Sequence, residues 1–227
     1  MEAPKALGTR RIKLPHRNRT IRKSIQPHNV GITAYLIGRG FTEFEGCSQQ
    51  NRGQVNDLKH ISKMRSIKTA LEIGFNAGHS AEIFLSTNPG LHLTSFDLGE
   101  HEYVTLAKEY IDTKFPGRHT LILGDSQKTV PEFIDANPGK VFDIIFIDGG
   151  HTYEVVAADV SNCAKLAHKT TVVVLDDTIY TVGWEKPYTI GPTKVWIENL
   201  QANRIHEINR RDYCNGNGMS WGRYVYD

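Results

Sequence analysis

Three carboxylates stand at the ends of two apolar runs in the second half of the chain. Asp148 follows the run at 141–147, and Asp176 and Asp177 follow the run at 171–175. If these runs are neighbouring parallel strands, about 4.8 Å apart, the three acids converge and repel one another when ionised. A hard divalent cation relieves that repulsion, and oxygen ligands favour Mg²⁺, Mn²⁺ or Ca²⁺ over zinc. We therefore predict a metal site at Asp148, Asp176 and Asp177.

A glycine-containing loop at 74–80 follows an earlier apolar run at 68–73. Its glycines let the backbone turn and approach a ligand, and a helix after them would point its N–H groups there. The Gly-x-x-x-Gly spacing differs from the dinucleotide pattern, which argues against an oxidoreductase. The alternative is an ordinary strand-to-helix turn. The cofactor-binding residues that we predict in and beside this loop are Glu72, Gly74, Asn76, Gly78 and Ser80.

Polar residues also follow the next two runs, at 91–96 and 120–123. Ligands of open parallel sheets bind at the carboxyl ends of the strands, where Asp97 can accept the ribose hydroxyls of an adenosine. The side chains at 125–127 can form hydrogen bonds with the polar edge of an adenine. These positions predict a site for a nucleoside with an amino-acid tail. The remaining cofactor-binding residues in this prediction are Asp97, Asp125, Ser126, Gln127 and Asp148.

Alternating strands and helices must position these residues. We expect strands at 68–73, 91–96, 120–123, 141–147 and 171–175, with helices at 54–64, 80–85, 100–114, 129–136, 153–167 and 193–201. Continuously apolar strands are typical of parallel sheets covered by helices on both faces. Two further strands, at 204–210 and 220–226, flank a turn signal at 215–218 and form a hairpin. The predicted fold is α/β, a Rossmann-like doubly wound seven-stranded sheet, mostly parallel with a C-terminal antiparallel hairpin.

The motif Glu72-Ile-Gly-Phe-Asn-Ala-Gly-His-Ser80 resembles the first motif of class I S-adenosylmethionine-dependent methyltransferases, which cradles the methionine part of the cofactor. Asp97 resembles the ribose-binding acid of that family, and Gly124-Asp-Ser-Gln127 resembles its adenine loop. The resemblance runs from about residue 47 to residue 180. It implies S-adenosylmethionine as the cofactor and a methyltransferase domain at 31–227. A non-enzymatic domain that senses a nucleoside is the alternative.

The acids resemble the metal site of cation-dependent O-methyltransferases of the catechol and caffeoyl-CoA type. A lysine base commonly stands three residues past the first Asp there, and His151 occupies this position here. The motif at 147–154 looks more like a group that includes enzymes acting on sugar hydroxyls. The resemblance implies O-methylation of a sugar or glycan, with Asp148 and His151 as catalytic residues, because an imidazole pKa near ~6.5 suits a base. A catechol-like acceptor is one alternative; helix caps at the acids and a structural histidine are another.

An aromatic segment at 178–192 follows the predicted metal strand. Long loops near a site tend to be functional, so we predict that Tyr180, Trp184 and Tyr188 contact the substrate. Packing of the loop itself would explain the same aromatic residues equally well.

A basic arm precedes the predicted domain. Residues 1–30 carry eight Lys and Arg against one acid, whereas the rest of the chain carries 19 basic and 24 acidic residues. Such an arm could bind nucleic acid or an anionic membrane, or join this domain to others in a larger chain. We favour a linker, because the arm lacks interleaved aromatic residues. A nucleic-acid methyltransferase is kept as an alternative, although the Asn/Asp-Pro-Pro-aromatic motif is absent after the fourth strand.

The three cysteines lack metal-ligand spacing and indicate a reducing, cytoplasmic compartment. No apolar run approaches the ~20 residues that span a bilayer, and we expect no signal peptide. The expected partners are a small-molecule or glycan acceptor, with a homo-oligomer compatible with the sequence.

Overall fold

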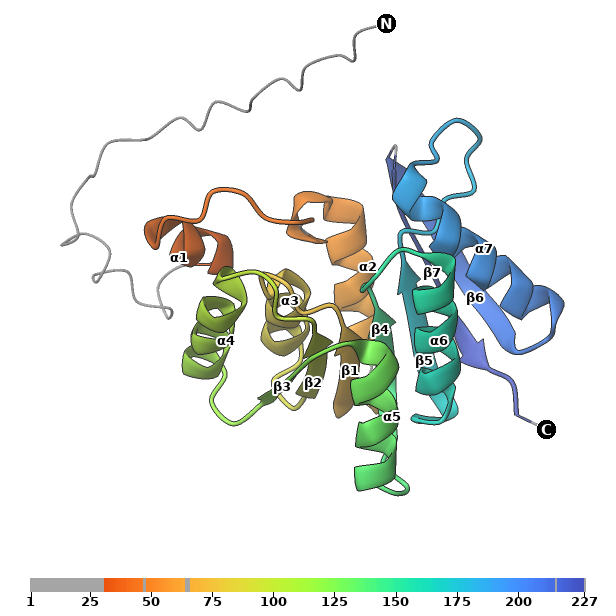
Figure 1. Cartoon of the computed structure of the whole chain (residues 1–227), viewed down its shortest axis with the longest axis horizontal. Coiled ribbons are helices and arrows are strands. Elements are labelled where there is room, and N and C mark those ends of the chain that lie inside the picture. The colour runs from red at the N-terminus through yellow and green to blue at the C-terminus, as the bar shows by residue number, and fades with distance from the viewer. Residues whose placement is uncertain (1–30, 47, 64–65, 215, 227) are drawn as a thin grey trace, which may run out of the picture.

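The computed structural model describes residues 31–46, 48–63, 66–214 and 216–226, so the predicted arm and Cys47 lie outside the described residues. Seven strands form one sheet in the order β3-β2-β1-β4-β5-β7-β6 (Figure 1). β1 to β5 are parallel, and β7 runs antiparallel to both β5 and β6, as predicted. The strands are β1 (Thr69–Ile73), β2 (His92–Asp97), β3 (His119–Leu123), β4 (Phe142–Ile147), β5 (Ala167–Asp176), β6 (Ile205–Cys214) and β7 (Asn217–Tyr224).

Helices cover both faces of the sheet (Figure 1). One apolar core joins the sheet to α1 through α4, and a second core joins its other face to α5 through α7. This arrangement confirms the doubly wound α/β fold. The helical segments are α1 (Ile32–Gly38), η3 (Ser48–Gln50), α2 (Arg52–Ser62), α3 (His79–Thr87), α4 (Tyr103–Lys114), α5 (Ser126–Ala136), α6 (Tyr153–Ala164) and α7 (Pro187–Gln201).

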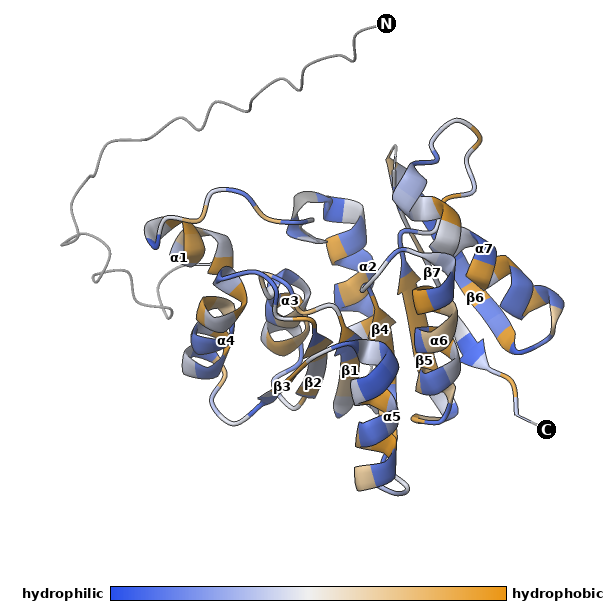
Figure 2. Ribbon diagram, in the orientation of Figure 1, coloured by the Kyte–Doolittle hydropathy of each residue, from blue (hydrophilic) through white to orange (hydrophobic). Residues whose placement is uncertain are grey.

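β4 shows why its sequence is continuously apolar. Ile144 and Phe146 pack into the core beneath α1 through α4, while Ile145 and Ile147 pack into the core beneath α5 through α7. Successive side chains of a strand point to opposite faces of the sheet, and here both faces are buried. Full burial of each such side chain contributes about 1.5–3 kcal/mol. Figure 2 shows the resulting hydrophobic band through β4 and β5.

The C-terminal hairpin is longer and tighter than predicted. Asn217 and Gly218 belong to β7 instead of the turn expected at 215–218. A side chain at Gly218 would meet the Thr178 carbonyl oxygen, because its Cβ would lie 2.2 Å from that atom. Glycine therefore serves close packing here instead of turn geometry.

α7 begins at Pro187, six residues before the predicted start at 193. Proline is favourable in the first turn of a helix, where its missing N–H is not needed. The aromatic segment expected as one long loop is thus divided, and Tyr188 lies on a helix. Similarly, α6 ends at Ala164 and β5 starts at Ala167, where we expected helix up to 167.

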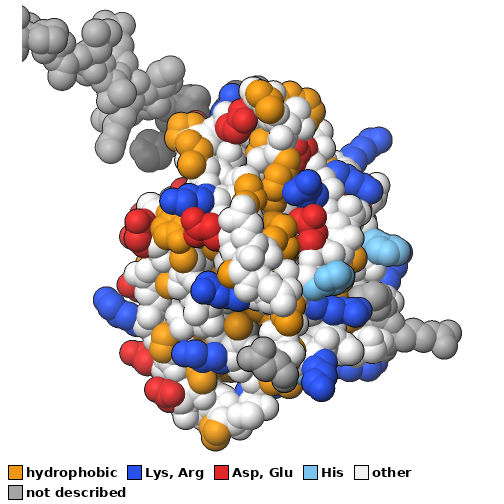
Figure 3. All heavy atoms as spheres, turned by 90° about the vertical axis from the view of Figure 1, so that its right-hand side faces the viewer, with side chains coloured by type: hydrophobic (Ala, Val, Ile, Leu, Met, Phe, Trp, Pro, Cys, Tyr) orange, Lys and Arg blue, Asp and Glu red, His pale blue; other side chains and the backbone are white. Residues whose placement is uncertain are grey.

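The side of the molecule at the right of Figure 1 carries hydrophobic side chains interspersed with charged groups of both signs (Figure 3). None of the described helices is both long enough and apolar enough to span a bilayer.

Candidate active site

A cavity of about 950 Å³ opens at the carboxyl ends of the strands. It is bounded by the loops after β1 to β5, by the start of α2 and by the tip of the hairpin. Eleven of the predicted site residues line it: Gly74, Asn76, Ser80, Asp97, Asp125, Ser126, Asp148, His151, Asp176, Asp177 and Tyr188. The cavity lining does not include Glu72, Gly78, Gln127, Tyr180 or Trp184.

The loop after β1 approaches the loop after β4 too closely for a side chain. Gly74 has φ +94°, and a Cβ there would lie 1.9 Å from the Asp148 carbonyl oxygen. Asn76 also has a positive φ of 48°. Its backbone N–H donates to Oδ2 of Asp97 at 2.8 Å, while Gly99 donates to Oδ1 at 2.7 Å. Asp97 therefore fixes two loops and keeps further lone pairs toward the cavity.

Glu72 lies beneath this loop and is fully buried. It accepts hydrogen bonds from the Ser80 hydroxyl at 2.5 Å and the Ser95 hydroxyl at 2.6 Å. Burial raises the pKa of Glu72 to about 7. Gly78, in the left-handed conformation, is the N-cap of α3. Neither residue lines the cavity, so cofactor binding by Glu72 and Gly78 stays a prediction.

The loop after β3 is organised by Asp125. Its carboxylate caps α5 by accepting the backbone N–H of Gln127 at 3.0 Å. Asp125 and Ser126 face the cavity, and Gln127 supplies this N–H from the first turn of the helix. The cap is worth about 1 kcal/mol and holds the loop in place.

The predicted acids meet as expected at the ends of β4 and β5. Asp176 is buried and hydrogen-bonded to Asp148, and burial followed by neighbouring carboxylates raises the pKa of both groups. The side chain of Gln54, from α2, donates to Oδ2 of Asp176 at 2.6 Å. The second oxygen, Oδ1 of Asp176, is buried without a hydrogen-bond partner in the described structure. Such an orphan oxygen requires a partner.

His151 forms part of the same centre. Its Nε2 lies 2.8 Å from Oδ2 of Asp177, and this hydrogen bond raises the pKa of His151. Asp177 has φ +56°, a conformation that costs a non-glycine residue energy and that recurs at functional sites. Ligand atoms of Asp148, His151 and Asp177 lie within 4.8 Å of one another. This donor set, with the orphan oxygen of Asp176 beside it, fits a divalent cation.

The N-terminal part of α7 packs closely against the His151 loop. A Cβ at Gly191 would lie 2.3 Å from the His151 carbonyl oxygen, so this helix can approach the loop because residue 191 has no side chain. The Tyr188 ring lies 5.6 Å from the imidazole at 60°. Its hydroxyl donates to the Gly216 carbonyl at 2.9 Å, which ties α7 to the hairpin.

Tyr180 contacts the hairpin through its side chain, and Trp184 contacts it through its backbone carbonyl. The Tyr180 hydroxyl is 3.1 Å from Oγ of Ser220, and the Arg210 guanidinium lies 4.2 Å above its ring. The Trp184 carbonyl accepts the backbone N–H of Gly216 at 2.9 Å. Neither residue lines the cavity, and the Tyr180 side chain packs against the hairpin.

Several residues that line the cavity were not predicted from the sequence. Gln54 and Asn217 look like ordinary polar positions of a helix and a turn. Glu45 and His101 stand in segments without a motif, yet their side chains pair at 2.7 Å across the rim of the cavity.

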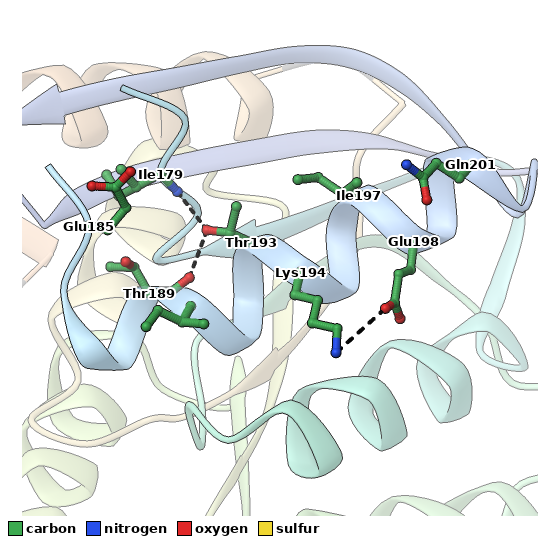
Figure 4. Close-up of a pocket in the computed structure, with 9 residues that line it drawn as sticks. Ile179, Glu185, Thr189, Thr193, Lys194, Ile197, Glu198 and Gln201 are labelled. Atoms are coloured by element: carbon green, nitrogen blue, oxygen red, sulfur yellow. Dashed lines mark hydrogen bonds and ion pairs between the residues drawn. The ribbon is translucent and has the colours of Figure 1, made fainter. Parts of the chain in front are cut away.

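A second hollow, of about 410 Å³, runs along α7 (Figure 4). The Thr193 hydroxyl links the Ile179 backbone N–H to the Thr189 carbonyl there, and Lys194 pairs with Glu198 one turn further on. These contacts stabilise the helix and its approach to the sheet. The cavity at the strand ends contains the clustered acids and histidine and is therefore the candidate active site.

Residues 71–178 match the model of a family described as a methyltransferase domain. This segment runs from β1 past the end of β5 and contains the glycine-containing loop at 74–80, His151 and the three acids. A comparison with the sequences of curated proteins gave no match.

Solved O-methyltransferases share the fold at low identity. The enzyme from Bacillus cereus in complex with SAH is 16% identical, covers 86% of this chain and 89% of its own, and has a TM-score of 0.66. The O-methyltransferase TomG from Streptomyces achromogenes, which is involved in tomaymycin synthesis and is bound to SAM, is 14% identical. The match covers 86% of this chain and 96% of TomG, with a TM-score of 0.62. A TDP-rhamnose 3'-O-methyltransferase of calicheamicin biosynthesis is 19% identical. The match covers 77% of this chain and 82% of that enzyme, with a TM-score of 0.57. The family match covers residues 71–178, and the solved structures share the fold of the chain.

Proposed function

We propose that this protein transfers a methyl group from S-adenosylmethionine to a hydroxyl oxygen of a sugar or glycan, with a divalent cation in the site and His151 as the general base. The observation that carries the proposal is the position of the His151–Asp177 pair. It lies in the same cavity as the glycine loop, beside Asp148. The cofactor and the base would therefore face one acceptor.

The cofactor half of the cavity suits the chemistry of S-adenosylmethionine. Asp97 presents carboxylate oxygens for ribose hydroxyls, and Ser126 presents a hydroxyl beside the expected adenine. The loop after β1 brings backbone N–H groups of α3 toward the cofactor carboxylate. Solved neighbours that contain SAH or SAM support this assignment.

Asp148, Asp176 and Asp177 would hold the cation. When bound, a divalent cation lowers the pKa of a coordinated hydroxyl and fixes its orientation. Oδ2 of Asp177 faces His151, which leaves its other oxygen for the cation. The buried orphan oxygen of Asp176 is the second feature that supports such an ion.

His151 would take the proton of the acceptor. The hydroxyl oxygen forms a bond to the methyl carbon as the carbon–sulfur bond breaks, and that electron pair stays on sulfur, giving neutral S-adenosylhomocysteine. The proton moves to Nδ1 of His151, because Nε2 already faces Asp177. The Asp177 carboxylate then stabilises the imidazolium. A base of this kind contributes typically ~10²–10⁴-fold to the rate.

The test combines calorimetry with methyl-transfer assays. We expect binding of S-adenosylmethionine and Mn²⁺ and methyl uptake by sugars. EDTA should abolish turnover while cofactor affinity is maintained. His151→Gln should lower kcat by about 10²-fold or more at unchanged cofactor affinity. His168 forms a similar pair with Asp143 at 3.1 Å outside the cavity lining, so His168→Gln is the matched control. Turnover unaffected by both EDTA and His151→Gln would contradict the mechanism.

A further inference from the structure

A carboxylate that the proposed mechanism does not use is buried on α6, behind the wall of the cavity. Asp159 has no exposed surface. A Cβ at Gly149 would lie 3.7 Å from its Oδ2, and the Ser126 hydroxyl, at the start of α5, acts on the same carboxylate. Ser126 and Gly149 both line the cavity. Asp159 therefore stands directly behind the part of the wall that these two residues form.

This carboxylate lacks hydrogen-bond donors. Among the residues that the structure describes, neither Oδ1 nor Oδ2 of Asp159 has a partner of regular hydrogen-bond geometry. The Ser126 hydroxyl approaches outside that geometry: burial raises the pKa of Asp159 to about 6, and hydrogen bonding by Ser126 opposes this rise. At pH 7.5 the group is ionised and can only accept. Because a buried carboxylate without a donor is costly, it draws the hydroxyl proton of Ser126 toward itself.

The direction of this proton decides what Ser126 offers to the cavity. A hydroxyl has one proton to donate and two lone pairs that accept. With the proton directed to Asp159, Oγ of Ser126 presents only lone pairs to a ligand. It then accepts a hydrogen bond from an amino group and opposes a carbonyl oxygen at the same place.

The order of the strands places the base of the proposed cofactor at this wall. Asp97 faces the cavity from the end of β2, where it would accept the ribose hydroxyls, and β3 is the next strand outward. Ser126 follows β3, so it lies beyond the ribose. Leu98 lines the cavity and is 60% exposed, which offers an apolar surface to a purine ring. A base that packs there would bring its polar edge to Ser126.

We propose that Asp159 is a positioning residue that makes the cofactor site specific for a 6-aminopurine, because it holds the Ser126 hydroxyl as a hydrogen-bond acceptor. Asp159 lies outside the cavity lining and acts through Ser126. The inference rests on the proposed function, whose cofactor carries adenine, and adds discrimination against hypoxanthine. Hypoxanthine has the same shape, but it carries a carbonyl oxygen in place of the 6-amino group.

Calorimetry with S-adenosylhomocysteine and S-inosylhomocysteine at pH 7.5 tests the proposal, and the measured quantity is the ratio of their Kd values. Asp159→Asn keeps the shape of the side chain, and its amide donates to Ser126, which frees the hydroxyl proton to turn toward the cavity. Ser126→Ala removes the hydroxyl and tests the same step if Asp159→Asn does not fold. Asp135→Asn, which removes an exposed carboxylate from α5, is the matched control.

We expect wild type and Asp135→Asn to bind the adenosyl compound at least tenfold more tightly than the inosyl compound, the effect of about one mispaired polar group. Asp159→Asn and Ser126→Ala should each reduce this preference to about twofold or less. The double variant Asp159→Asn/Ser126→Ala should have the same ratio as Ser126→Ala alone, because Asp159 acts through that hydroxyl.

A purely structural role of Asp159 would weaken both ligands by the same factor, and an unchanged ratio in Asp159→Asn and Ser126→Ala would therefore overturn the inference. Equal binding of the two compounds by wild type would overturn it as well, while the proposed function would stand. The expected ratios in a protein that transfers no methyl group would support the inference and refute the proposed function. Binding of neither compound would refute both.

Discussion

The Glu72→Gln substitution should make the protein more stable at neutral and alkaline pH. Glu72 is fully buried, and burial raises its pKa from an ordinary 4.5 to about 7. Between these values the folded protein keeps a proton that the unfolded chain has lost. Because the native state then binds more protons, stability falls as pH rises through this window. Glutamine keeps the shape and never ionises, so the variant lacks this loss.

The size of the effect follows from linkage. With pKa values of 4.5 and about 7, the loss that Glu72 causes grows by about 2.5 kcal/mol between pH 5 and pH 8. For a chain of this length that corresponds to roughly 5–10 °C in Tm. The amide can accept from one of the two serine hydroxyls and donate to the other, because a hydroxyl does both.

Urea unfolding of the ligand-free protein at pH 5, 6, 7 and 8 measures the difference. The difference in the free energy of unfolding between Glu72→Gln and wild type should increase in favour of the variant at each step from pH 5 to pH 8. Glu132→Gln, which removes an exposed carboxylate on α5, should run parallel to wild type. If Glu72→Gln also ran parallel, Glu72 would be ionised throughout, and the account of a buried neutral carboxyl under the loop would be wrong.

Two glycines give further predictions. Gly74→Ala should destabilise the fold by about 3 kcal/mol or more in thermal unfolding, since its Cβ would lie 1.9 Å from a carbonyl oxygen. Gly139→Ala, with a similar positive φ but open space, should lose only about 1 kcal/mol, and equal losses at both sites would contradict the close-approach argument. Gly191→Ala should lower kcat at least tenfold at unchanged cofactor affinity, because it displaces α7 from the His151 carbonyl. Full activity would show that α7 does not position His151.

The order of strands explains why distant residues could be placed together from the sequence. Asp148 and Asp176 are predicted to converge because parallel strands present their carboxyl ends on one edge, and the pairing of β4 with β5 confirms this. The prediction of helices on both faces of the sheet was based on continuously apolar strands such as the one that contains Ile144 and Ile145. These features depend on strand periodicity and chain connectivity, which are local properties of the sequence.

Other features depend on contacts that no local pattern contains. Gln54 binds Asp176 across 122 positions in the chain. The alternation of polar and apolar residues in a helix does not indicate such a partner. Similarly, Glu72 lies next to the end of an apolar strand, and no local pattern indicates that it accepts hydrogen bonds from Ser80 and Ser95. The start of α7 was missed because the aromatic segment at 178–192 was interpreted as one loop, although Pro187 stands at the start of a helix, where proline is accepted.

The position of His151 is compatible with two roles, a general base and a cation ligand. As a base, it needs one ring nitrogen free and the other fixed by a carboxylate, which orients the ring and stabilises the imidazolium. The 2.8 Å contact between Nε2 and Asp177 supplies the second condition. As a cation ligand, it would offer Nε2 beside Oδ2 of Asp177, because ligand atoms of Asp148, His151 and Asp177 already lie within 4.8 Å of one another. In the proposed function, His151 takes the proton and the three carboxylates hold the cation.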